Sequence, residues 1–150
     1  MPRGLFSRLL RLYPSPIPEE DYFTEMVAWL FENDRQLLYK WLKECLQMDA
    51  PYSACRVETQ VEFDKLEGHT LSSRPDFLFT LYEDDQQDIL MMESKISATE
   101  GYQQLPRYAD QLSHGYPEAR HRYLVYVSRS YDPKETGYVL RNIGKPNIIF

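Results

Sequence analysis

The chain has 150 residues, of which 43% are hydrophobic and 14% aromatic, and its formal net charge is -6 at pH 7. This length and composition predict one folded domain with a sizeable core and exclude the intrinsically disordered class. No run approaches the roughly eighteen apolar residues of a membrane-spanning helix, so no membrane is expected as a partner, and the net charge argues against general affinity for nucleic acid.

Charge is unevenly distributed along the chain. Residues 117–150 hold six Arg or Lys against three Asp or Glu, and the first twelve residues hold three arginines and no acid. Positive charge therefore collects at the two ends and acid in the middle. A basic surface for a phosphate backbone and a solvated surface of mixed sign are both compatible with this distribution.

The two cysteines, Cys45 and Cys55, form no CxxC pair and have no histidine in metal-ligand spacing. A zinc site is therefore not expected, and a reduced, cytoplasmic protein is the default.

The first 18 residues contain arginines and leucines but lack the apolar core and cleavage site of a secretory signal. A mobile arm and a short amphipathic helix both fit, and we favour the arm. Prolines at positions 14, 16 and 18 separate this segment from the rest of the chain.

Two helices are expected next, over residues 18–33 and 35–48. Acids crowd the first turn of the first helix, where the helix dipole favours them. Its apolar face is predicted from three- and four-residue spacing to comprise Phe23, Met26, Val27, Leu30 and Phe31. Asp34 is a good N-cap for the second helix, and Pro51 follows its end.

Strand patterns follow the two helices. Residues 55–63 alternate apolar and polar with period two, and strands are also predicted over 75–82 and 89–96, joined by the acidic turn 83–88. These three strands should form an antiparallel meander. A strongly apolar strand over 122–130, buried on both faces, and a last strand within 137–150 complete the predicted set.

A helix is expected between the third and fourth strands, over residues 97–115. Ser97 or Thr99 could cap it and Gly115 could stop it. Because Pro106 would disturb a helix interior, the helix should begin only near Leu105 or bend there. The element order predicts a single α/β domain with a mixed sheet and a right-handed parallel crossover.

Charged residues lie at the ends of two strands that are otherwise apolar. Glu93 and Lys95 project from one face of the strand 89–96. If the hairpin centres on the dipeptide at positions 84 and 85, Asp76 lies opposite Glu93, with Cβ atoms about 5 Å apart. Two close carboxylates need a cation between them or a retained proton. Lys95 and Mg²⁺ are the candidate cations, and a Mg²⁺–carboxylate pair suits phosphodiester hydrolysis.

Pro75-Asp76 followed by Glu93-Ser94-Lys95 resembles the signature of the PD-(D/E)XK nuclease superfamily, in a bacterial branch. The resemblance covers about residues 19–130. It implies a restriction-endonuclease-like core, in which helices flank a mixed sheet made of an antiparallel meander and a parallel crossover strand. A helical glutamate of that superfamily is matched by Glu25. A glutamine on the later helix is matched best by Gln104, with Gln103 as a competitor and Gln111 as a weaker one.

The resemblance also implies roles. Asp76 and Glu93 would hold Mg²⁺, for which Mn²⁺ could substitute, and the Ser94 carbonyl would be a further ligand. Glu25 would act through a water or a second metal. Lys95 would be the catalytic cation, and Gln104 would orient the site or contact the phosphate. Tyr108, on the same helix face as Gln104, could assist catalysis. Arg74, next to Asp76 in sequence, could contact a phosphate.

The function expected is therefore a metal-dependent nuclease, with DNA as substrate and endonucleolytic cleavage. Two alternatives stay open: an inactive nuclease-fold module that binds nucleic acid or a protein, and an α/β scaffold in which Asp76, Glu93 and Lys95 form a salt-bridge cluster. A homodimer could combine the basic ends of two chains. Relatives in that branch often continue further, so the chain is expected to be a truncated or shortened copy.

Four tyrosines and two polar residues of the first strand are weaker candidates. Glu58 and Gln60 could face the site. Base stacking is conceivable for the tyrosines, although sheet packing explains such residues more often; they are Tyr123, Tyr126, Tyr131 and Tyr138.

Overall fold

The computed structural model describes residues 4–12, 19–96, 98–140 and 148–150. The helices are α1 (Leu5–Arg11), α2 (Glu19–Asn33), α3 (Arg35–Leu46), α4 (Gln104–Gly115) and α5 (Thr136–Leu140). The strands are β1 (Ala54–Thr59), β2 (Phe77–Glu83), β3 (Gln86–Lys95), β4 (His121–Ser128) and β5 (Ile148–Ile149). Among the described residues, no helix is both long and apolar enough to cross a membrane.

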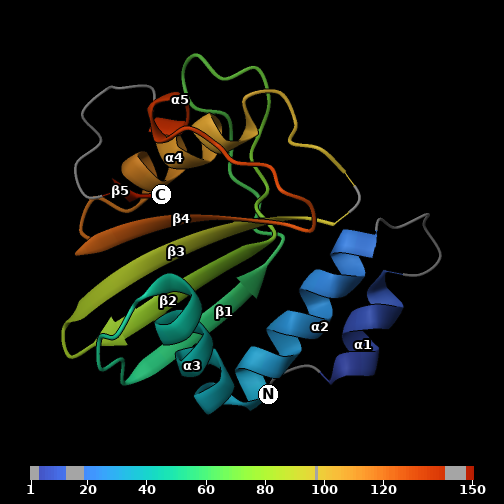
Figure 1. Cartoon of the computed structure of the whole chain (residues 1–150), viewed down its shortest axis with the longest axis vertical. Helices are drawn as coiled ribbons and strands as arrows, with labels where there is room; N and C mark the ends of the chain where they lie inside the picture. Colours follow the sequence, from blue (N-terminus) through green and yellow to red (C-terminus); the bar gives the residue numbers. More distant parts are fainter. Residues whose placement is uncertain (1–3, 13–18, 97, 141–147) are drawn as a thin grey trace.

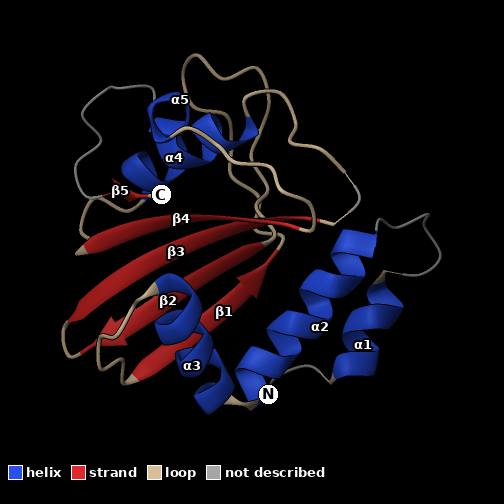
Figure 2. Ribbon diagram, viewed as in Figure 1, coloured by secondary structure: helices blue, strands red, loops and turns tan. Residues whose placement is uncertain are grey.

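The strands form one mixed sheet in the order β1-β2-β3-β4-β5. β1, β2 and β3 are an antiparallel meander, whereas β4 is parallel to β3, and β5 is parallel to β4. Figures 1 and 2 show α2 and α3 on one face and α4 and α5 on the other, with α1 beside α2. The predicted α/β fold with a mixed sheet and flanking helices is confirmed in these terms.

Each face of the sheet has its own core. Leu90 and Met92 of β3 pack toward α2 and α3, in a cluster that includes Phe31 and Leu38. Met91, from the intervening position of β3, packs on the opposite face in the cluster that contains α4. This alternation places Glu93 and Lys95 on the α4 face, since side chains two residues apart share a face.

The hairpin register is the one predicted. Phe77 pairs with Met92 and Glu83 with Gln86, so the turn is centred on Asp84 and the residue after it. Asp84 has a φ of 52°, in the left-handed region that hairpin turns require and Asp tolerates.

Several boundaries differ from the predictions. The first strand ends at Thr59 instead of residue 63, because Gln60 turns the chain with a φ of 54°. The N-terminal segment contains helix α1, which corresponds to the alternative prediction of a short helix and not to the favoured arm. Helix α4 begins at Gln104, as the proline rule predicts, so that Pro106 lies in the first turn, where its missing N–H is harmless. The N-cap position is Gln103 and not Thr99; Ser97 lies outside the described residues.

The buried face of α2 also differs from the prediction. Met26 and Leu30 are 42% and 44% exposed, whereas the buried positions are Glu20, Thr24, Glu25, Ala28 and Phe31. The two acids of this face have partners: Glu20 accepts from the backbone after β3, and Glu25 from Thr59 of β1, with Arg8 and Arg11 of α1 nearby. The buried Thr24 hydroxyl has no hydrogen-bond partner among the described residues. Asp34 is confirmed as the N-cap of α3, since its side chain accepts a hydrogen bond from the Leu37 N–H at 3.0 Å.

The end of the chain follows the prediction in part. β5 is the expected last strand, but a short helix, α5, precedes it, and residues 141–147 lie outside the described part. β4 is less buried than its apolar sequence predicts, with Val127 39% exposed.

Candidate functional site

Two carboxylates converge where β2 begins and β3 ends. Asp76 lies one residue before β2, and extending the register beyond the last pair, Phe77 with Met92, places it opposite Glu93. Its Oδ2 accepts a hydrogen bond of 2.7 Å from the backbone N–H of Ser94. Asp76 is 7% exposed and Glu93 2% exposed, so both acids are withdrawn from water. The predicted juxtaposition is therefore present.

Lys95 and Gln104 hold the Glu93 carboxylate. The Lys95 Nζ lies 2.7 Å from Glu93 Oε1, and the Gln104 Nε2 donates to the same oxygen at 2.7 Å. Gln104 also donates to the hydroxyl of Tyr108 at 2.9 Å, and Tyr108 itself interacts with Glu93. Of the rival glutamines, Gln103 occupies the N-cap position of α4, and Gln111 donates to the Asp64 carbonyl at 2.6 Å.

Gln60 and Asp21 also belong to this site, although the sequence offers Gln60 only as a weaker candidate and does not indicate Asp21. The Gln60 Nε2 lies 3.3 Å from Asp21 Oδ1 and 3.3 Å from Asp76 Oδ1, so the amide bridges the two acids. The left-handed turn at Gln60 brings it there, and the ladder continues into a hydrogen bond from its N–H to the Asp76 carbonyl. The sequence does not single out Asp21 as a site residue, because the helix dipole alone explains acids in the first turn of a helix.

The first turn of α2 supports the end of β3 as well. The Glu20 carboxylate accepts hydrogen bonds from the backbone N–H groups of Ile96 and Ala98, at 3.0 and 3.1 Å. Its charge also acts on Lys95. α2 therefore contributes acids to this region from its first turn.

Glu25, the expected helical glutamate, lies apart from these residues. Its Oε1 accepts a hydrogen bond of 2.6 Å from the Thr59 hydroxyl, and its Oε2 faces Arg8 at 3.5 Å and Arg11 at 3.9 Å. Within the described residues it has no hydrogen bond or ion pair with Asp76, Glu93 or Lys95. The structure thus does not bring Glu25 to the carboxylate pair.

Three other candidates have distinct positions. The Ser94 side chain is buried without a hydrogen-bond partner among the described residues, and its main chain reaches the site through the bond to Asp76. Arg74 is exposed, with no hydrogen bond or ion pair inside the described ranges. Glu58 pairs with Arg56 at 2.7 Å and does not join the cluster.

Burial and mutual repulsion alter the protonation of the acids. Desolvation, followed by the charge of Glu93, raises the pKa of Asp76 to about 7, although the Ser94 N–H and Lys95 oppose the shift. Desolvation also raises the pKa of Glu93, against the stabilising bonds from Lys95, Tyr108 and Gln104. Burial alone would lower the pKa of Lys95, but its bond to Glu93 and the surrounding acids raise it. Near neutral pH the pair therefore holds a proton that a cation could replace.

The donor set fits Mg²⁺. Glu93 Oε2 is buried and has no hydrogen-bond partner among the described residues, so this oxygen is available as a metal ligand. The described residues contain no group of three His, Cys, Asp or Glu side chains placed to hold a metal ion. Mg²⁺ commonly binds through one or two carboxylates and keeps several waters, so Asp76 and Glu93 suffice.

Comparisons with protein families, curated proteins and solved structures give no match to this chain. The site must therefore be interpreted from its own chemistry.

Proposed function

We propose that the chain has a restriction-endonuclease-like fold and is a Mg²⁺-dependent endonuclease of the PD-(D/E)XK type that cleaves phosphodiester bonds in DNA. The observation that carries the proposal is the buried Asp76–Glu93 pair: one Glu93 oxygen has no partner among the described residues, and Lys95 lies 2.7 Å from the other oxygen. Burying two acids side by side lowers the stability of the fold, and a site with a purely structural role would be more stable without the second acid.

Asp76 and Glu93, with the Ser94 carbonyl, would hold the metal ion, which would polarise a phosphoryl oxygen and lower the pKa of an attacking water. The chain supplies the remaining functions. Lys95 would stabilise negative charge that develops on the phosphate. Gln104 and Tyr108 fix the orientation of Glu93, as supporting hydrogen bonds do around metal ligands. Gln60 does the same for Asp76.

DNA cleavage tests the proposal directly. Supercoiled and linear DNA would be incubated with Mg²⁺ or Mn²⁺ and the wild type, Asp76→Asn or Lys95→Met, and Glu44→Gln would serve as an exposed acidic control. Metal-dependent cleavage that both site variants lose and the control retains is the expected result. Metal binding without cleavage of DNA or RNA would instead favour the inactive binding module.

The short Lys95–Glu93 contact favours one competing interpretation, a structural salt bridge at the sheet end. Lys95→Ala leaves Glu93 buried without its counter-ion in either interpretation, so it should lower stability in both. Only a nuclease also loses metal-dependent cleavage in a variant that urea denaturation shows to be still folded under the assay conditions.

A further inference from the structure

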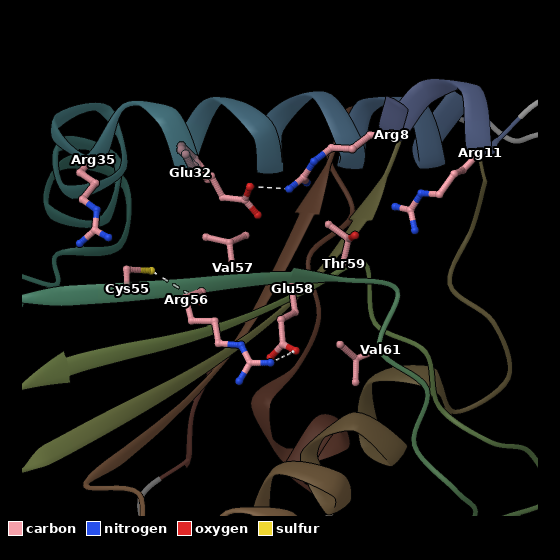
Figure 3. Close-up of a pocket in the computed structure, with 11 residues that line it drawn as sticks. Arg8, Arg11, Glu32, Arg35, Cys55, Arg56, Val57, Glu58, Thr59 and Val61 are labelled. Atoms are coloured by element: carbon pink, nitrogen blue, oxygen red, sulfur yellow. Dashed lines mark hydrogen bonds and ion pairs between the residues drawn. The ribbon is translucent and has the colours of Figure 1, made fainter. Parts of the chain in front are cut away.

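An arginine-rich groove of about 790 Å³ lies along β1, away from the carboxylate pair. Figure 3 shows side chains of α1, α2 and α3 above the strand and two β1 side chains below it. The groove is lined by four arginines, Arg8, Arg11, Arg35 and Arg56, against two acids, Glu32 and Glu58. A net positive groove is unexpected on a chain of net charge -6.

The arginines differ in how firmly they are held. Arg8 is buried and ion-paired with Glu32, so it belongs to the packing of α1 on α2. Arg35 is exposed and has no hydrogen bond or ion pair within the described ranges. Arg11 is 54% exposed in its side chain, and its nearest carboxylate, on Glu25, lies 3.9 Å away. The pair of Arg56 with Glu58 is exposed, and such pairs contribute little, so an anion can displace the carboxylate.

The groove continues toward the carboxylate site. β1 is an outer strand of the sheet, and its residues from Cys55 to Thr59 line the groove. The next residue along the chain is Gln60, whose amide contacts Asp76 at 3.3 Å. The strand portion of the groove is about 13 Å long, since five extended residues span four steps of about 3.3 Å. An extended polymer lying along β1 would thus approach Asp76 at its end.

We propose that this groove binds the sugar–phosphate backbone of a nucleic acid, with Arg11, Arg35 and Arg56 as its phosphate contacts. The assignment rests on the proposed function, because it makes the groove the approach of the substrate to Asp76. The guanidinium fork matches phosphate oxygens bidentately, and guanidinium groups spaced along a groove suit a repeating anion. An acidic peptide carries the same charge as a nucleic acid, but it has no phosphodiester bond for the proposed site at Asp76 to cleave.

Binding is measured without divalent metal, so that cleavage cannot interfere, by fluorescence anisotropy of labelled single-stranded and duplex DNA over a range of salt concentrations. Arg11→Ala and Arg35→Ala should each weaken binding about fivefold and reduce the slope of log K against log salt by about 0.9. Arg35→Lys should keep most of the slope, because it keeps the charge. Lys40→Ala, an exposed cation elsewhere on α3, should bind like the wild type.

Two results would contradict the proposal that this groove binds nucleic acid. The first is equal DNA binding by the wild type and the arginine variants, and the second is no DNA binding by the wild type. Displacement of bound DNA by polyglutamate at equal charge, with tighter binding of the peptide, would also reject a nucleic-acid groove. Parallel cleavage assays keep the two proposals distinguishable. If the wild type cleaves DNA and the arginine variants bind DNA normally, the groove proposal is rejected and the nuclease proposal stands. If DNA binding depends on the arginines but no cleavage occurs, the nuclease proposal is rejected and the binding groove stands.

Discussion

The Asp76 carboxylate accepts a 2.7 Å hydrogen bond from the backbone N–H of Ser94, which fixes it opposite Glu93 at the end of β3. This bond favours the ionised form of Asp76, yet burial and the charge of Glu93 outweigh it. The same geometry therefore determines both the stability of the fold and the affinity of the site for a cation.

Asp76→Asn should stabilise the protein above neutral pH. The folded-state pKa of Asp76, about 7, lies above the unfolded value near 3.8, so the folded state binds more protons between these values and loses stability as pH rises through them. Asparagine removes this loss and still accepts the Ser94 hydrogen bond. We expect a gain of about 2 kcal/mol at pH 8 and almost none at pH 4. Urea denaturation at the two pH values measures the difference; an equal effect at both would contradict this account.

Mg²⁺ or Mn²⁺ should stabilise the wild type in a pH-dependent way. Protons compete with the metal for Asp76, so the rise in melting temperature at saturating metal should be about 5 °C at pH 8 and smaller at pH 5.5. Asp76→Asn and Glu93→Gln should abolish the shift. Differential scanning calorimetry provides this test without any assay of activity, and an unchanged shift in both variants would place the metal elsewhere.

Gln104→Ala should lower cleavage by about 10- to 100-fold, the usual effect of removing a hydrogen bond that supports a metal ligand. The physical reason is the 2.7 Å bond from Gln104 to Glu93. Gln36→Ala is the matched control, because it removes the same side chain from an exposed position of α3. Similar losses of activity in both variants would contradict a specific role of the Gln104–Glu93 bond.

The Asp76–Glu93 pairing could be predicted from sequence because a two-residue turn fixes the register of every residue in a hairpin. The partners contributed by Gln60 and Asp21 could not, since they depend on a left-handed residue after β1 and on how α2 crosses the sheet. The choice of Glu25 illustrates the same limit. Helical periodicity indicates which residues share a face, but not which turn of that face reaches the site.

Asp88 shows a second kind of limit. Nothing in an acidic turn region predicts a carboxylate that is 0% exposed. Its partners come from segments far apart in sequence: the Tyr52 hydroxyl donates to it at 2.7 Å, and Arg120 donates through Nε and an Nη, at 2.9 and 2.7 Å. This network lies about 17 Å along β3 from Glu93, since Asp88 and Glu93 are five residue steps apart. The Asp88 network therefore has a structural role, near the opposite end of β3 from the candidate site.

Arg120→Met should therefore destabilise the fold without direct damage to the site. The variant leaves the Asp88 charge buried without its counter-ion, at an expected cost of about 3 kcal/mol at pH 7. In the wild type, burial tends to raise the pKa of Asp88, but the bonds from Arg120 and Tyr52 lower it overall. That contribution to stability is present above the unfolded pKa and is lost only as pH falls below about 4.

Without Arg120, the pKa of Asp88 should rise above its ordinary value, so the defect should grow as pH increases from about 4 to 7. Urea denaturation across this range measures it. Arg129→Met, at an exposed position, should stay within about 0.5 kcal/mol of the wild type. Adding Asp88→Asn to Arg120→Met should recover part of the loss and abolish its pH dependence, because no buried charge then remains. A double variant as unstable and as pH-dependent as the single one would show that Asp88 does not carry the charge that Arg120 compensates.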